Sequence, residues 1–171
     1  LLFQVQPMIS KFILPWFGGS PAVWTTAMLF FQCVLCAGYV YAHVLTRLHS
    51  RQWQAGIHIA LLLLGALLAF TILPDSNWKP TGEEAPALQV LLILGASVGV
   101  PYFCLATTGP LVQHWFSHTA QTGSVYRLYA LSNIGSFTAL LSFPYLFEPW
   151  FDLQQMSHGW GWGFSLFVVL C

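Results

Sequence analysis

The residues of this sequence that could bind a ligand are the polar side chains within its long apolar stretches. The first stretch holds Gln4, Gln6 and Lys11. Gln4 and Lys11 are seven residues apart, so on a helix they share nearly one face. Polar groups inside a membrane are costly and often mark function. We therefore predict a polar centre that binds an anionic or hydrogen-bonding group, formed by Gln4, Gln6, Lys11, Asn133 and Glu148.

The same residues also have a structural interpretation. Lys11 can extend to the outer membrane interface, with its aliphatic stem along apolar surface. The glutamines and Asn133 can hydrogen-bond to neighbouring helices, and the small neighbours Ser132 and Ser136 would permit that approach. We expect Lys11 to face the bundle interior and to reach a partner such as Glu148. If the first and fifth helices run in opposite directions, packing would have to bring Lys11 and Asn133 to comparable depth.

Histidines and cysteines are the other candidate ligands. We predict no cofactor. A haem or a chlorin is the alternative, and its candidate ligands are His43, His58, His114 and His118. His114 and His118 are four apart, but the sequence has no third ligand nearby and no H-E-x-x-H pattern. Cys33 and Cys36 form a C-x-x-C in mid-helix, where cysteine behaves as a small hydrophobe. With no Ser/His/Asp set, phosphate loop or paired carboxylates, we predict no catalytic residue and no metal site.

The composition is that of a membrane protein. Of 171 residues, 57% are hydrophobic and 6% are charged, whereas soluble domains have roughly 25% charged residues. The net charge is zero and there is no basic patch, which excludes nucleic acid as a partner. Membrane lipids and other helices are the expected partners.

The apolar stretches predict an all-α polytopic transmembrane helix bundle that forms a single domain. A bilayer-crossing helix needs roughly 20 apolar residues, and about five to six stretches approach that length. Proline should kink the fourth helix at Pro101 and near Gly109–Pro110. Both ends of the chain lie in apolar runs, so we expect part of a longer protein. The predicted helices are 1–17, 21–45, 53–73, 87–116, 125–147 and 156–171.

Loop charges predict the orientation. Alternate turns carry Arg47, Arg51 and Arg127, and the opposite turns carry Glu83, Glu84, Glu148 and Asp152 with Lys79. The positive-inside rule then places the arginines on the cytoplasmic side of the membrane.

Small residues four apart indicate where helices approach closely. Such pairs lie on one helix face and let neighbouring backbones come together. We expect Gly95 and Gly99 to lie against another helix. The remaining pairs are Gly38 with Ala42, Ser132 with Ser136, and Gly135 with Ala139.

Several blocks carry a resemblance to a known family. They are Gln4–Pro7 with Lys11, Leu14–Trp24, Gly38–His43, Thr108–Phe116, Leu128–Ser136 and Pro144–Pro149. In this order they resemble the N-terminal membrane region of bacterial fused transporter/spermidine-synthase-like proteins. The resemblance implies a following cytosolic domain similar to aminopropyltransferases, with a doubly wound α/β sheet. This sequence has neither the Gly-rich strand-to-helix turn nor the acidic pair of such a domain.

Three functions remain open at this point. The first is a permease-like or small-solute-binding membrane domain centred on the polar residues. The second is a structural subunit of a larger membrane complex that bears pigments or haems. The third, implied by the resemblance, is the membrane anchor of an aminopropyltransferase.

Overall fold

A computed structural model describes residues 1–80, 85–117 and 123–171. This part of the chain is helical and contains no strand. The elements are α1 (Leu2–Ile13), η1 (Leu14–Phe17), α2 (Pro21–Thr46), α3 (Arg51–Leu68), η2 (Ser76–Trp78), α4 (Pro86–Leu94), η3 (Gly95–Gly99), α5 (Val100–Ser117), α6 (Gly123–Ser142), η4 (Phe143–Phe147), α7 (Glu148–Trp150) and α8 (Leu153–Leu170).

The all-helical fold predicted from the sequence is confirmed. Because η3 joins α4 to α5 and η4 joins α6 to α7, the described residues form six continuous helices. Three stretches are long and apolar enough to cross a membrane. Their mean hydropathies are 1.7, 2.0 and 1.2, and they are Pro21–Thr46, Pro86–Ser117 and Tyr126–Trp150.

Local chemistry sets the helix ends. Gly18 and Gly19 have φ angles of 72° and 66°, a left-handed conformation that glycine adopts without strain and that ends the first helical segment. Ser20 is the N-cap of α2 and makes no side-chain capping bond. At α8, Asp152 accepts a hydrogen bond from the Gln155 backbone N–H at 2.7 Å, and the Gln155 side chain accepts from the Asp152 N–H at 3.2 Å. This capping box starts α8 three residues before the predicted Met156.

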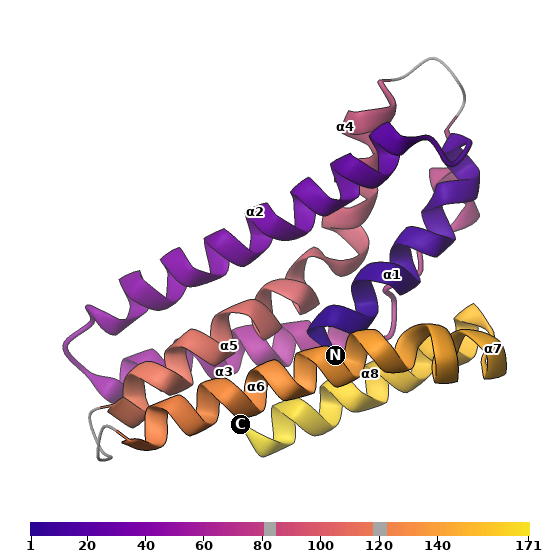
Figure 1. Cartoon of the computed structure of the whole chain (residues 1–171). Coiled ribbons are helices and arrows are strands. Elements are labelled where there is room, and N and C mark those ends of the chain that lie inside the picture. The colour runs from indigo at the N-terminus through magenta and orange to yellow at the C-terminus, as the bar shows by residue number, and fades with distance from the viewer. Residues whose placement is uncertain (81–84, 118–122) are drawn as a thin grey trace.

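The predicted third helix is also shifted. We expected it over 53–73, and the structure has α3 over Arg51–Leu68. The irregularity expected at Pro101 is the π-helical segment η3, which ends at Gly99, two residues before the proline. Such segments bend helices, and the chain changes direction between α4 and α5 (Figure 1). Pro110 lies inside α5 without a change of helix type.

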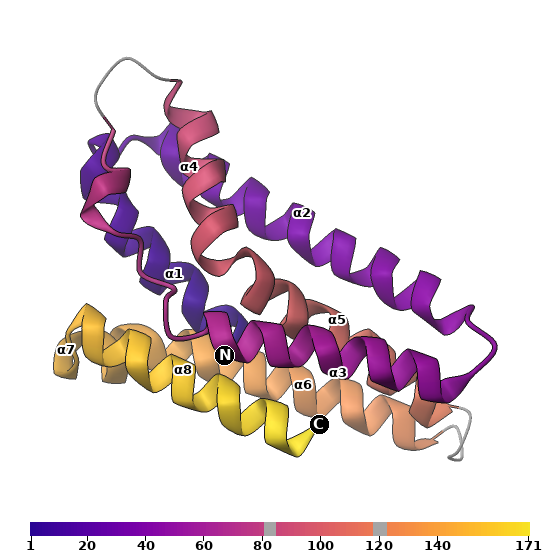
Figure 2. The ribbon, with the colours of Figure 1, turned by 180° about the vertical axis from the view of Figure 1, so that it is seen from behind.

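The helices form an elongated bundle with two ends (Figures 1 and 2). The α1–α2 turn, the α4 start and α7 lie toward one end. The α2–α3 turn, the α5 end and the α6 start lie toward the other. Alternate turns therefore lie at the same end. This arrangement makes α1 and α6 run in the same general direction, which corrects our expectation of opposite directions.

Close helix contacts occur at glycines, although not at all of those we predicted. A Cβ on Gly38 would lie 3.0 Å from the Ala106 Cβ, so α2 and α5 approach closely, as the Gly38–Ala42 pair predicted. A Cβ on Gly65 would lie 2.7 Å from the Cys104 Sγ, so α3 and α5 also approach closely. Gly95, which lies in the π segment, has nothing within 4 Å, so the expected contact is wrong there. Gly99 has the Phe30 ring at 3.9 Å.

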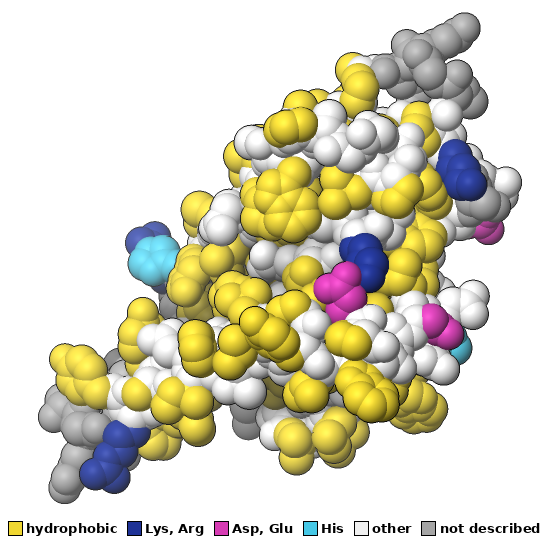
Figure 3. All heavy atoms as spheres, turned by 45° about the vertical axis from the view of Figure 1, so that its right-hand side comes forward, with side chains coloured by type: hydrophobic (Ala, Val, Ile, Leu, Met, Phe, Trp, Pro, Cys, Tyr) yellow, Lys and Arg dark blue, Asp and Glu magenta, His cyan; other side chains and the backbone are white. Residues whose placement is uncertain are grey.

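The surface of the bundle is largely apolar. Hydrophobic side chains cover most of the face in Figure 3, and charged ones are few. Large side chains such as Val169, Tyr126 and Leu67 are 82%, 79% and 77% exposed. Membrane lipid is a surrounding in which such a surface is stable.

Candidate functional site

Lys11 and Glu148 form an ion pair that links α1 to α7. The Lys11 Nζ lies 2.6 Å from the Glu148 Oε1. The partner is the carboxylate that we expected, but the location is not, because the two side chains are 45% and 41% exposed rather than inside the bundle. Both residues lie toward the ends of helices that run in the same direction (Figure 1). The pair therefore joins two helices at the surface of the bundle.

Gln6 joins α1 to α5. Its Nε2 donates to the Tyr102 hydroxyl at 2.9 Å. Tyr102 is 1% exposed, and its ring lies 5.0 Å from the Phe31 ring of α2. Gln6 thus satisfies a buried tyrosine hydroxyl in the core, which is the helix-linking role that we considered as an alternative.

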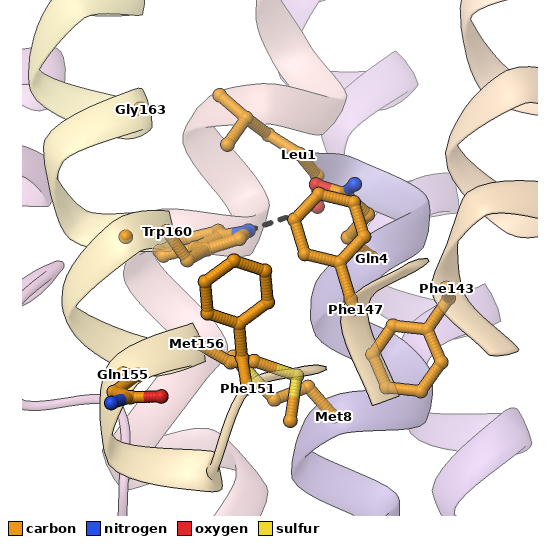
Figure 4. Close-up of a pocket in the computed structure, with 11 residues that line it drawn as sticks. Leu1, Gln4, Met8, Phe143, Phe147, Phe151, Gln155, Met156, Trp160 and Gly163 are labelled. Carbon is orange, nitrogen blue, oxygen red and sulfur yellow. Dashed lines mark hydrogen bonds between the residues drawn. The ribbon is translucent and has the colours of Figure 1, made fainter. Parts of the chain in front are cut away.

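Gln4 lines a cavity of about 360 Å³ between α1, η4 and α8. Most of its lining is aromatic or methionine side chains, which surround the space in Figure 4. The Trp160 Nε1 closes one side by donating to the Leu1 carbonyl at 3.0 Å. We call this space the aromatic cavity. It is lined by Leu1, Gln4, Met8, Phe143, Phe147, Phe151, Gln155, Met156, Gly159, Trp160 and Gly163.

Asn133 lines a different cavity of about 410 Å³, on the other side of the start of α1. We call it the polar cavity. Its polar groups are two tyrosines, two serines and two amides, and its lining contains no charged side chain. These polar residues come from three helices and are Tyr39, Gln113, Tyr129, Ser132, Asn133 and Ser136.

The depth of the polar cavity follows from helix geometry. Asn133 is the tenth residue after Gly123, the start of α6. At 1.5 Å per residue it lies about 15 Å along the helix, which is half of the roughly 30 Å that a membrane-crossing helix spans.

The Asn133 amide is available for binding. No hydrogen bond joins its side chain to another residue in the described part of the chain, and the residue is exposed. Ser136 instead donates to the Ser132 carbonyl at 2.8 Å within α6. An asparagine side chain offers one acceptor and two N–H donors. The polar cavity is therefore equipped to hold a neutral, hydrogen-bonding group.

The α5 wall adds a backbone acceptor to the polar cavity. Pro110 lies inside α5 and has no N–H, so the usual intrahelical donor to the Ala106 carbonyl is missing. Ala106, Gly109 and Pro110 all line the cavity. Gly109 carries no side chain there, which leaves room beside this backbone.

The histidines are dispersed over separate environments. His58 is 4% exposed, and its Nε2 lies 3.1 Å from the Thr108 hydroxyl. Because Thr108 donates to the Cys104 carbonyl at 2.7 Å, His58 must donate through Nε2, which leaves Nδ1 as a buried acceptor without a partner among the described residues. His43 bonds Arg47 at 2.9 Å. His114 lies at the end of α5, and His118 lies outside the described residues.

Metal-ligating side chains do not gather in the described part of the chain, where no group of three or more His, Cys, Asp or Glu residues occurs. Cys33 and Cys36 are free and lie exposed on α2, in keeping with their interpretation as small hydrophobes.

The structure thus distributes the five predicted polar residues over four places. Lys11 and Glu148 meet each other, Gln6 meets Tyr102, Gln4 enters the aromatic cavity and Asn133 the polar cavity. Sequence reasoning missed Gln113, although an amide within an apolar stretch was the signal that identified Asn133. It also missed Tyr102, whose type and spacing are ordinary for a core residue.

A comparison of the chain with models of protein families, with curated proteins and with solved structures found no match.

Proposed function

We propose that the chain is a multi-pass bacterial inner-membrane domain that binds a small, neutral, polar solute in the polar cavity. Five to six helices cross the membrane in this proposal, with the arginine-bearing turns in the cytoplasm. The observation that carries it is the cavity of about 410 Å³ with Asn133 on its wall. Ligand pockets usually have volumes of roughly 300–1,000 Å³.

The cost of an unsatisfied amide supports this function. Lipid offers no hydrogen bonds, so an unpaired polar group at membrane depth costs several kcal/mol. Asn133 therefore needs a partner, and in the described residues its side chain has none. A solute that accepts from the Asn133 NH₂ and donates to its carbonyl would supply both bonds at once.

The lining also indicates the class of solute. With no charged side chain in the wall, an ion would enter the membrane without a counter-charge, at high cost. Hydroxyls, amides and the Ala106 carbonyl instead favour neutral groups such as amides or polyols. Lys11 and Glu148 are outside this site, and in this proposal they hold α1 against α7.

The test is a solute screen on purified wild-type protein and on Asn133→Leu, with Thr138→Val as a matched control. Thr138 is also on α6 but does not line the cavity, and its hydroxyl bonds the Ile134 carbonyl of its own helix. A solute at 100 times its Kd stabilises the protein by about 2.7 kcal/mol. We expect a neutral polar solute to raise the Tm of the wild type and of Thr138→Val but not of Asn133→Leu. Equal stabilisation of all three proteins would contradict the site. If the solute binds as expected, its flux in proteoliposomes would test whether the protein also transports it.

A second candidate function rests on the exposure of α6. Of the apolar stretch in Tyr126–Trp150, which begins in α6, only 6% is buried inside the bundle, compared with 56% for the stretch in Pro86–Ser117. Gly135, which we expected to pack closely, has nothing within 4 Å. A structural role in a larger membrane complex would cover this face with another helix. Recovery of a stoichiometric partner from native membranes, lost on Gly135→Leu, would favour it over solute binding.

The family resemblance adds a third proposal, the anchor of an aminopropyltransferase-like domain. It rests on the sequence blocks that carry the resemblance. An aminopropyltransferase-like domain encoded in the same reading frame would support it, and a reading frame without one would refute it.

A further inference from the structure

A basic pocket of about 310 Å³ lies at the end of the bundle where α2 ends, α3 begins and α5 ends. It is distinct from the polar cavity. The side chains that matter for its chemistry are Arg47, His49, Arg51, Gln54, His114 and Trp115. Two permanent cations thus share one small concave site, with two imidazoles beside them.

No carboxylate of the described residues neutralises this pocket. Asp75, Glu148 and Asp152 belong to the turns at the opposite end of the bundle, which Figures 1 and 2 show through the positions of α3, α7 and α8. The Arg47 guanidinium contacts the His43 Nε2 at 2.9 Å, which is a neutral partner. Within the described residues, the charges of Arg47 and Arg51 therefore have no acidic partner.

The backbone adds to this attraction. Ser50 is the N-cap of α3 and makes no side-chain capping bond, so the first N–H groups of an 18-residue helix are without that partner. The positive end of a helix dipole and its unpaired N–H groups favour phosphate. The pocket thus combines a helix N-terminus with two arginines.

Gln54 makes the pocket a formed site. It is 5% exposed, donates to the Leu48 carbonyl at 2.7 Å and accepts from the Trp115 Nε1 at 2.8 Å. These bonds fix the α2–α3 turn against α5. The arginines of the turn are therefore carried by a segment that a buried amide holds in place.

We propose that this pocket binds the phosphate group of an anionic phospholipid. Arginine forms paired hydrogen bonds with phosphate oxygens, and basic pockets between membrane helices suit such headgroups. Leu48 in the pocket wall is 41% exposed, and Trp53 in the first turn of α3 is 71% exposed. Apolar and interfacial side chains therefore flank the site where the acyl chains of the lipid would continue. The site is separate from solute binding at Asn133 and shares with it only the membrane location.

The experiment measures lipid retention by native mass spectrometry after reconstitution with phosphatidylglycerol and phosphatidylcholine. The variant is Arg47→Gln/Arg51→Gln, and the matched control is Arg127→Gln, which removes an exposed arginine at the same end that does not line the pocket. Each arginine near an anionic lipid contributes a similar share of the binding free energy, and the loss of two should raise the Kd for the lipid about thirtyfold. We expect that loss for the double variant, with near wild-type retention for Arg127→Gln.

Two further measurements separate the outcomes. Arg47→Lys/Arg51→Lys keeps the charge and should retain phosphatidylglycerol above the Gln variant, which separates lost binding from misfolding. Inorganic phosphate should not displace the bound lipid. Added to the lipid-free protein, it should not raise the Tm as the lipid does. Equal retention by the Gln variant, or an equal loss in Arg127→Gln, would overturn the pocket. Protection by inorganic phosphate equal to that by the lipid would overturn the lipid as its source.

Discussion

Replacing Gly38 tests whether the contact between α2 and α5 holds the bundle together. An added Cβ at this position would meet the Ala106 Cβ at 3.0 Å, the Ala106 carbonyl carbon at 3.2 Å and the Thr107 nitrogen at 3.3 Å. Two of these atoms are backbone, so they cannot rotate away. Carbon atoms pack at about 3.5–4.0 Å, so α2 and α5 must separate by about 0.5–1 Å to admit alanine.

The size of the effect follows from two opposing terms. Such a gap loses about a quarter to a half of each dispersion contact across the interface, and overpacking of this kind costs about 1–3 kcal/mol. Alanine gains about 0.5–1 kcal/mol over glycine in helix propensity. We therefore expect Gly38→Ala to lower the free energy of unfolding by about 1–2 kcal/mol. Gly38→Leu should lower it by about 3 kcal/mol.

The assay is reversible unfolding in mixed micelles, followed by circular dichroism. Gly56 is the control, because a Cβ there meets nothing within 4 Å, so Gly56→Ala should be neutral or stabilising. Ala106→Gly removes the nearest atom and should recover part of the loss when combined with Gly38→Ala. If Gly38→Leu is as stable as Gly56→Leu, α2 and α5 are not in contact as described.

Two more predictions concern orientation and the surface ion pair. In a background without other reactive cysteines, a membrane-impermeant reagent applied from outside should label Asn77→Cys and not Ser50→Cys, because the proposed topology puts the arginine-bearing turns in the cytoplasm. The reverse pattern would invert that topology. Lys11→Glu and Glu148→Lys should each lower the free energy of unfolding by about 1 kcal/mol, because each replaces a half-exposed ion pair with two like charges. The charge-swapped double variant should recover most of the loss. Additive losses in that double variant would mean that the two side chains do not interact.

Helix positions were predictable because they depend on short-range sequence signals. Pro21 and Pro86 start α2 and α4 at the first helical turn, where the missing N–H costs nothing. Gly18 and Gly19 end the helical segment that precedes α2. The start of α8 was missed because Asp152 was taken only as a charge that marks a loop. Its spacing to Gln155 is that of a capping box.

Lateral contacts were much less predictable. Gly38, Gly95 and Gly135 all belong to the same four-residue pattern, yet Gly38 alone among these three has a neighbour within 4 Å. The pattern shows that one face of a helix carries small side chains. Whether another helix covers that face depends on how the helix is rotated about its own axis. Gly95 lies in the π segment η3, whose i→i+5 bonding departs from the α-helical repeat on which the four-residue pattern depends. For the same reason Gln6 and Gln4, which are two residues apart, reach different environments.

The sparse burial of α6 has a consequence for how the polar cavity communicates with its surroundings. Most of one polar wall of the cavity belongs to this helix, which contacts α1 and α5 along the described residues. If the proposed membrane location holds, a sideways movement of α6 exposes no apolar surface to water, because lipid replaces protein at its surface. The free-energy barrier to such a displacement then comes from a few packing contacts and from the tether between Lys11 and Glu148. In the proposed solute-binding function, the wall that carries Asn133 would be the one that moves, and the Lys11–Glu148 pair would hold its other end in place.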